Sequence, residues 1–301
     1  MPQDIPVKSG ASAMVPVLVC TLAIFLLSAM DAGMKALVIA IGVYNTVLWR
    51  TVLATGVAGA GWGFRSRSLP PLRSLRLHAL RALVVGIILI TFFWGLARVP
   101  LAVGIGLSFI APLFALLLAS LMLGERIRMA AIWAAAIGFG GVVIILIGQL
   151  GASDYSRDAL WGTISIFVST VFYGYNLVLT RKQAQLAKPI EIMFFQNLVL
   201  LAILAAAAPW IALALPREFW LPLVGVTILS LSGQYLMSWS YARAEAQYMI
   251  STEYSAFIWA IALGWFAFGE PVTWPTLAGA SLIIASCWIA TWASSRNVRG
   301  D

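Results

Sequence analysis

Three ionisable side chains lie within apolar stretches near the start of the chain, where a charge is costly. Asp31 and Lys35 are four residues apart, so on a helix they share one face and can form an ion pair. Arg50 follows in the next apolar stretch. Two interpretations are open. The three charges contact or gate a solute, or they lock two helices together while Lys35 extends its amine to the membrane interface.

Glu253 lies within an apolar stretch that contains no basic residue. At the rise of a helix it is roughly 10 Å from the expected start of its span. A carboxyl there suits binding of a coupled proton or a cationic group, and it equally suits a protonated side chain hydrogen-bonded to a neighbouring helix. We expect Glu253 to contact the substrate or the proton.

Aromatic and amide side chains in other stretches are suited to lining a pocket, because small-molecule sites combine apolar walls with a few polar groups. The candidates are Trp94, Tyr175, Asn176, Gln196, Gln234, Trp239, Gln247 and Tyr254. Each of them alone also fits a helix–helix contact or an interfacial belt.

The sequence contains no phosphate-binding glycine loop, no HExxH and no nucleophile motif, so we expect neither an enzyme nor an ATP-driven pump. An intramembrane enzyme would need a convergent catalytic pair. The one histidine, His78, is expected to be solvated in a basic loop between two spans. Cys20 and Cys287 lie in separate apolar stretches without metal-binding spacing. We therefore expect no cofactor and no metal.

The composition indicates a membrane protein. Only 10% of the 301 residues are charged and 62% are hydrophobic, whereas a soluble domain carries about 25% charged residues. The net charge of +8 does not indicate nucleic-acid binding, because the basic residues lie between apolar stretches. About 20 apolar residues span a bilayer, and ten such stretches occur, at 14–37, 43–63, 79–97, 100–123, 130–150, 158–180, 190–210, 218–241, 246–268 and 273–294.

The distribution of Lys and Arg predicts the orientation of these spans. If both termini are cytoplasmic, the inner segments hold all of the 19 basic residues except Lys35, Arg50, Arg98, Arg157 and Arg217. Such a bias over short loops indicates the cytoplasmic side. We expect a multi-pass protein of the cytoplasmic (inner) membrane with its N- and C-termini inside.

An internal repeat is the most specific feature of the sequence. The segment from Trp94 to Arg98 matches the segment from Trp239 to Arg243, and the pairs Gly124-Glu125 and Gly269-Glu270 follow at the same offset of 145 residues. The offset corresponds to five spans, an odd number, so the second copy must lie upside down in the membrane. We expect an all-α protein of ten transmembrane helices in two inverted five-helix repeats, at 14–150 and 158–294. The two glutamates end spans, and we expect them to cap loops or bind basic residues. Inverted repeats are typical of secondary transporters.

At these residues the chain resembles the EamA domain of the drug/metabolite transporter superfamily. The residues that carry the resemblance are Ala97, Pro112, Leu123-Gly124-Glu125, Ala134-Ala135, Ile137 and Gly141-Val142, and in the second copy Ala242, Phe268-Gly269-Glu270, Gly279-Ala280 and Leu282-Ile283. Phe257 stands where the family pattern has the proline that corresponds to Pro112, and Ala134 stands in place of a glycine. The resemblance implies alternating access and movement of small organic solutes, driven by protons or by exchange of solutes.

A narrower likeness covers Asp31-Ala32-x-x-Lys35 and Trp49-Arg50, which resemble the S-adenosylmethionine and riboflavin uptake branch. Glu253 and Asp31 favour a cationic or zwitterionic solute, such as S-adenosylmethionine or an amino-acid derivative, whereas Lys35 and Arg50 equally suit a carboxylate. We expect a metabolite transporter. The alternatives are an exporter of the same fold or a structural or receptor-like membrane protein. The expected partners are the solute, the lipid bilayer, and either protons or an exchanged solute. The sequence does not distinguish a homodimer from a monomer.

Overall fold

The chain is helical throughout the part that its computed structural model describes, which comprises residues 14–65, 70–123, 129–150, 157–184, 186–187, 189–241, 243, 252–253 and 255–295. The helices are α1 (Met14–Ile41), α2 (Val43–Arg65), α3 (Leu72–Leu96), α4 (Leu101–Ser108), α5 (Ala111–Leu123), α6 (Met129–Leu150), α7 (Arg157–Ala184), α8 (Pro189–Ile211), α9 (Arg217–Tyr241), α11 (Ser255–Phe268) and α12 (Trp274–Ser295).

Five of these helices, α1, α3, α7, α8 and α9, are long and apolar enough to cross a membrane. Shorter apolar helical segments lie at Leu101–Ala115, Ala136–Ile145, Ser255–Phe268 and Trp274–Ser286. Large apolar side chains remain exposed along the bundle, as at Phe266 and Trp274, and lipid tails solvate such a surface. The protein is therefore a multi-pass, all-helical membrane protein.

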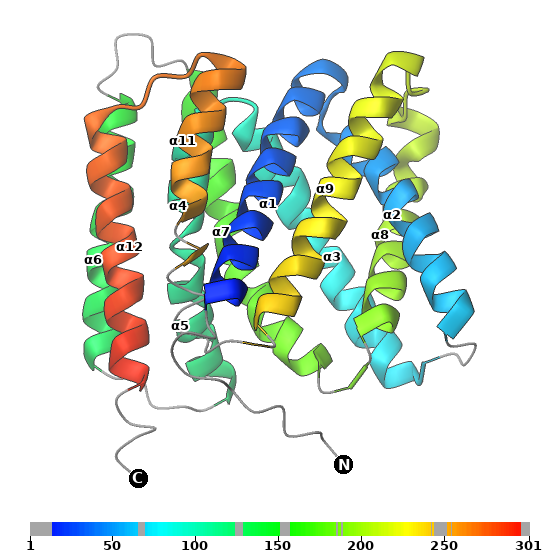
Figure 1. The fold of residues 1–301 in the computed structure, drawn as a ribbon, viewed down its shortest axis with the longest axis horizontal. Helices are drawn as coiled ribbons and strands as arrows, with labels where there is room; N and C mark the ends of the chain where they lie inside the picture. The colour runs from blue at the N-terminus through cyan, green and yellow to red at the C-terminus, as the bar shows by residue number, and fades with distance from the viewer. Residues whose placement is uncertain are drawn as a thin grey trace.

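The helices stand side by side and define two ends of the bundle. We call the end where α1 meets α2 at Gly42 the upper end, and the end where α1 begins and α12 finishes the lower end (Figure 1). Gly42 lies between α1 and α2 with a φ of +80°, a left-handed conformation that favours glycine. The first residue of α1 and the last residue of α12 thus lie at the same end of the bundle.

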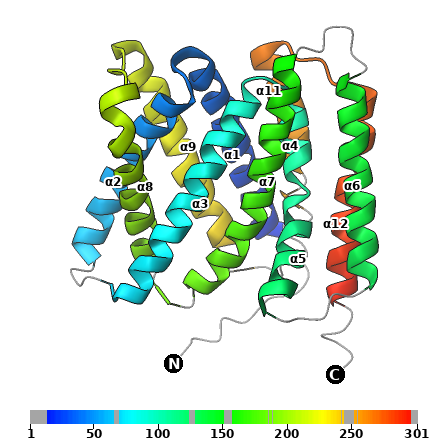
Figure 2. The same ribbon diagram turned by 180° about the vertical axis from the view of Figure 1, so that it is seen from behind.

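Helices far apart in the sequence form the main pairs. α1 packs on α9, α3 on α7, α2 on α8 and α6 on α12. α6 and α12 form one edge of the bundle and α2 and α8 the other, as both views show (Figures 1 and 2). Glycines allow the closest approaches, because a Cβ on Gly141 would lie 2.5 Å from the carbonyl oxygen of Gly279, and the reverse holds at the same distance.

Proline breaks one apolar segment into two helices. Pro112 has no N–H to donate to Ser108, so an unbroken helix would leave that carbonyl without its backbone partner. The chain instead forms the tighter bonds from Phe109 N to Gly106 O and from Ile110 N to Leu107 O, and α5 then begins at Ala111. Phe257, which replaces the second proline, is buried and its ring contacts that of Phe109 at 6.4 Å between centroids.

Candidate functional site

A buried ion pair joins distant parts of the chain at the upper end. The amine of Lys35 on α1 forms an ion pair with Glu270, which lies between α11 and α12, and also donates to the carbonyl oxygen of Val99 at 2.6 Å. The second carboxylate oxygen of Glu270 accepts the backbone N–H of Leu101 at 2.7 Å. Leu101 is the first residue of α4, so the carboxylate also lies at the positive end of a helix dipole.

The local sequence around Glu270 explains its position. Gly269 adopts a φ of +64°, which reverses the chain after α11 at no steric cost to a glycine. Gly264 leaves room for the carboxylate, since a Cβ there would lie 2.8 Å from Oε2 of Glu270. Both glycines are therefore required by the ion pair. The expectation that Glu270 caps a loop or binds a basic residue is confirmed; Glu125 lies outside the described residues.

The predicted pairing of Lys35 with Asp31 is wrong. Lys35 uses its hydrogen bonds on Val99 and Glu270, and its amine also lies 5.0 Å from the ring centroid of Phe268. A buried ammonium needs several acceptors, and the groups near the upper end supply them. Asp31 instead interacts electrostatically with Arg50 on α2.

Arg50 is bound on only one side of its guanidinium. Its Nη2 donates to Ser230 Oγ on α9 at 2.8 Å, and Gln234 donates to the same hydroxyl at 2.9 Å. The Nε of Arg50 is buried and has no hydrogen-bond partner. No hydrogen bond or ion pair joins Arg50 to Asp31, although both residues belong to the described part of the chain.

Tyr173 on α7 connects this region electrostatically with other parts of the fold. It interacts with Asp31 on α1, Arg81 on α3 and Glu253. We call Asp31, Arg50, Tyr173 and Ser230 the central polar site.

A second polar network joins α3 to α7 and α8 near the lower end. Arg81 donates its Nε to Asn176 Oδ1 at 3.0 Å and its Nη1 to Gln183 Oε1. Gln183 donates its amide to Nδ1 of His78, so the Nε2–H of His78 faces Glu191 at 3.3 Å. His78 is fully buried inside α3. The expectation of a solvated loop histidine is therefore wrong, because α3 begins six residues before it.

Glu253 is not unpaired. It accepts a hydrogen bond from the hydroxyl of Tyr241 on α9 and interacts electrostatically with Cys20 on α1. Two further polar atoms in this region, Ser255 Oγ and Trp259 Nε1, are buried without a hydrogen-bond partner. The carboxyl is thus placed where α1, α9 and the start of α11 meet.

The repeated Trp–Arg motifs have the same geometry at opposite ends. Arg98 lies over Trp94 with its guanidinium carbon 3.6 Å from the ring centroid, and Arg243 lies over Trp239 at 4.2 Å. Each arginine also donates Nη1 to the carbonyl oxygen of its own tryptophan. Arg98 follows α3 at the upper end and Arg243 follows α9 at the lower end.

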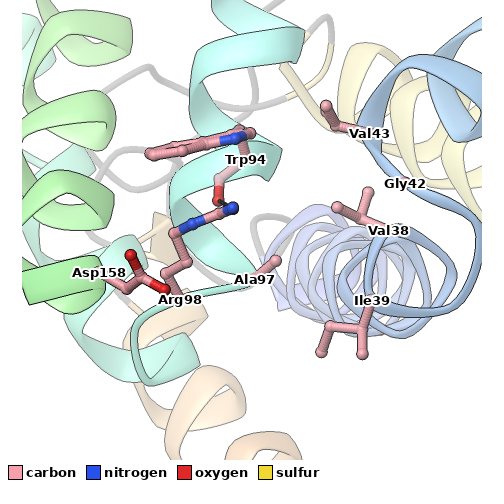
Figure 3. Close-up of a pocket in the computed structure, with 8 residues that line it drawn as sticks. All are labelled: Val38, Ile39, Gly42, Val43, Trp94, Ala97, Arg98 and Asp158. Atoms are coloured by element: carbon pink, nitrogen blue, oxygen red, sulfur yellow. Dashed lines mark hydrogen bonds between the residues drawn. The ribbon is translucent and has the colours of Figure 1, made fainter. Parts of the chain in front are cut away.

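A cavity of about 480 Å³ opens beside the upper motif. Trp94, Arg98 and Asp158 form one wall and Val38, Ile39, Gly42 and Val43 on α1 and α2 form the other, as Figure 3 shows. Trp94 thus lines a cavity that does not include Glu253 or Asp31.

The other predicted site residues are dispersed. Asn176 and Gln234 join the two networks above, whereas Tyr175 and Gln196 are half-buried. Gln247 and Tyr254 lie outside the described residues. Arg81, Gln183 and Ser230 were not predicted as site residues. Arg81 could have been predicted from the sequence, because it is a cation within an apolar stretch. Nothing in the sequence distinguishes Ser230.

This geometry can now be compared with known proteins. The sequence model of the EamA-like transporter family matches residues 14–147 and 160–292. The chain belongs to the EamA-like transporter family. The resemblance inferred from Pro112, the two Gly-Glu pairs and the small residues that follow them is thereby confirmed, and the protein is a membrane transporter of this family.

Several named EamA-type relatives are transporters. The pseudopaline exporter of Pseudomonas aeruginosa is 26% identical over 278 residues, which cover 90% of this chain and 94% of the relative. The riboflavin transporter of Vibrio cholerae is 25% identical and covers 74% of each chain. The S-adenosylmethionine uptake transporter of Rickettsia bellii is 26% identical and covers 69% of each chain. These names are those of transporters of small molecules rather than enzymes.

A solved crystal structure shares the fold. It superimposes with a TM-score of 0.61 at 20% sequence identity and covers 94% of this chain and 98% of its own.

Proposed function

We propose that this protein is a secondary transporter of a small organic metabolite, built from ten spans in two inverted halves, 14–150 and 158–294, that work by alternating access. The packing supports it. The inverted repeat relates each span to the span five positions away in the chain. Under this exchange the α1–α9 contact becomes the α7–α3 contact, and in the α2–α8 and α6–α12 pairs the two helices change places. In this scheme α4 and α5 form one span.

One observation carries the proposal: three cationic side chains of the first half that lie inside spans bond to the second half. Lys35 contacts Glu270, Arg50 contacts Ser230, and Arg81 contacts Asn176 and Gln183. Structural interfaces in lipid are built from small residues and neutral polar side chains, whereas charged side chains within spans are rare and mark the pathways of solutes or ions. Polar groups along the whole interface can be hydrated when it opens, so the two halves can separate at either end.

The ion pair of Lys35 with Glu270 closes the upper end in this proposal. It links α1 and the start of α4 to the loop before α12. When the halves rock, this pair separates and the central polar site opens to the upper side. The lower network of His78, Arg81 and Gln183 closes the opposite side.

Glu253 is the proposed coupling group. It lies at a junction of three helical segments, and its bond to Tyr241 gives it a partner that can stay in place when the carboxyl gains or loses a proton. The driving force is then a proton gradient or an exchanged solute.

The proposed location is the cytoplasmic membrane with both termini inside, so that the upper end faces outward. The ends of α1 and α12 support a common side, and the bias of Lys and Arg supports the inside. Labelling of single cysteines placed at Ala214 and at Leu72 with a membrane-impermeant maleimide in intact cells tests this orientation. Reaction only at Ala214 is expected.

Reconstitution tests transport itself. Proteoliposomes would be loaded with S-adenosylmethionine, riboflavin or an amino-acid mixture and assayed for counterflow, with and without a pH gradient. Glu253→Gln is expected to abolish stimulation by the gradient, and Glu218→Gln, at an exposed position of α9, is the matched control. The proposed coupling role is lost if Glu253→Gln leaves both the rate and its dependence on the gradient unchanged.

Export is the second candidate, favoured by the 90% coverage of this chain in its alignment to the pseudopaline exporter. Vesicles of both orientations would distinguish export from uptake.

A further inference from the structure

The central polar site contains two opposite charges that are close but not joined. Asp31 on α1 and Arg50 on α2 interact electrostatically, and no hydrogen bond or ion pair links them. Bringing two opposite charges into an interior is costly, and direct contact would offset much of that cost. A third group that carries both charges would supply each of them with a direct partner.

The guanidinium of Arg50 is held with one side available. Nη2 is fixed by Ser230 Oγ, which Gln234 also binds, so the planar group has a defined orientation. Its Nε–H is buried and unpartnered, and an unmade bond of a buried charged donor costs free energy. A carboxylate accepts from two adjacent guanidinium N–H groups at once. The missing acceptor thus fits a carboxylate.

Asp31 offers the complementary charge. It is half-buried, as is Arg50, and it interacts electrostatically with Tyr173. In the proposed transport cycle a solute reaches these side chains when the two halves separate. Asp31 has no hydrogen bond to Lys35, the cation nearest along its own helix, because Lys35 is bound to Glu270 and Val99. An ammonium group would supply Asp31 with its donor.

We propose that Asp31 and Arg50 bind a zwitterionic solute that carries an α-amino-carboxylate group, with the carboxylate on Arg50 Nε–H and the ammonium on Asp31. This inference rests on the proposed transport function and names its substrate class. Tyr173 and Gln234 lie beside this group and face the rest of the solute.

The test compares probes that differ by one charge. Binding to the purified protein in detergent would be measured as a thermal shift for S-adenosylmethionine and for each free amino acid. For every probe that binds, two derivatives would also be measured: the methyl ester, which lacks the carboxylate, and the N-acetyl derivative, which lacks the ammonium. We expect at least one zwitterion to bind and both derivatives to bind about ten-fold or more weakly, since a bond to a charged group is worth roughly that factor.

Two substitutions assign the charges. Arg50→Gln is expected to remove the preference for the zwitterion over its methyl ester, and Asp31→Asn the preference over its N-acetyl derivative. A structural role would weaken the binding of all probes equally. It would leave the affinity of the zwitterion relative to its methyl ester and relative to its N-acetyl derivative unchanged. Arg76→Gln and Glu218→Gln change the same charges at exposed positions and are expected to leave the ratios unchanged.

The outcomes separate this inference from the transport proposal. Unchanged ratios in both variants, or the absence of any zwitterion that binds, overturn the zwitterion site. If riboflavin nevertheless shows counterflow in proteoliposomes, the transport proposal stands. If no probe of either kind is transported, both proposals fail.

Discussion

The two ends of the bundle are joined by different chemistry. At the upper end two full charges, Lys35 and Glu270, meet directly and are supported by one backbone carbonyl and one backbone N–H. At the lower end the charges of Arg81 and Glu191 are kept apart, and the amide of Gln183 and the imidazole of His78 connect them. The upper contact depends on two side chains, whereas the lower one is distributed over a chain of groups.

This difference implies unequal sensitivity to substitution. Removing one partner of a direct buried ion pair leaves an uncompensated charge, which costs about 3–5 kcal/mol. Removing one link of a neutral chain leaves a buried donor or acceptor, which costs about 1–3 kcal/mol. The upper end should therefore behave as a single contact that is either made or broken, and the lower end as one that weakens in steps.

The largest effect is expected for Lys35→Met. It leaves Glu270 with the N–H of Leu101 as its remaining partner, so the free energy of unfolding should fall by about 3–5 kcal/mol. Denaturation of the purified protein in mixed micelles measures this loss. The double variant Lys35→Met/Glu270→Gln should be more stable than Lys35→Met, because Gln keeps an acceptor for Leu101 without a buried charge. If the losses in unfolding free energy of the two single variants simply added in the double variant, a direct pair of Lys35 and Glu270 would be contradicted.

The next largest effect is expected at Gly264, which leaves space for the carboxylate of Glu270 at the same end. In Gly264→Ala the new Cβ would lie 2.8 Å from Glu270 Oε2, so the carboxylate must shift and its bond with the N–H of Leu101 is disturbed. We expect a loss of about 1–3 kcal/mol, consistent with overpacking. Gly225→Ala on α9 is the matched control, since a Cβ there meets nothing within 4 Å. Equal behaviour of the two variants would show that Gly264 has no steric role.

A smaller effect is expected at the lower end. His78→Phe keeps an aromatic ring beside Phe195, which stacks on His78 at 5.9 Å between centroids. It removes the acceptor of the Gln183 side-chain N–H and the imidazole that faces Glu191, while the bond of Gln183 with Arg81 remains. The expected loss is about 1–3 kcal/mol, below that of Lys35→Met in the same denaturation assay. A loss as large as that of Lys35→Met would mean that the lower end is not the more tolerant one.

The smallest effect is expected where the two ends are alike. Arg98→Gln and Arg243→Gln each remove a cation from a tryptophan face, and exposed contacts of this kind are worth about 0.5–1 kcal/mol. Similar small losses at the two positions are expected in melting curves. A large loss at one position alone would show that the repeated motifs have diverged in role.

The sequence predicted the helical, membrane-embedded class and the family because these depend on local hydropathy and on short motifs. It placed Asp31, Lys35 and Arg50 in the spans but could not predict their partners. Lys35 and Glu270 are 235 residues apart and His78 and Gln183 are 105 apart, and helical spacing informs only about neighbours three or four residues away. Asp31 was therefore assigned the nearest cation, and His78 was assigned to a loop because the helix boundary was placed too late.

Ser230 and Tyr173 illustrate the other limit. Serine and tyrosine inside spans commonly bond to their own helix or lie at the interface, so nothing in the sequence distinguishes these two from the rest. Their position beside Arg50 and Asp31 follows only from the packing of α9 and α7 on other helices.

The stacked arginines bear on how the chain enters a membrane. Cationic residues are retained on the cytoplasmic side during insertion, so a duplicated motif that lies at both ends carries one cation to the wrong face. Arg98 is that residue in the proposed orientation. Its guanidinium is folded onto Trp94 and bonded to a backbone carbonyl within the same helical turn, a contact that can form as soon as α3 does. Early shielding of this charge would let the first copy of the motif keep its arginine without opposing the topology that the inner arginines direct.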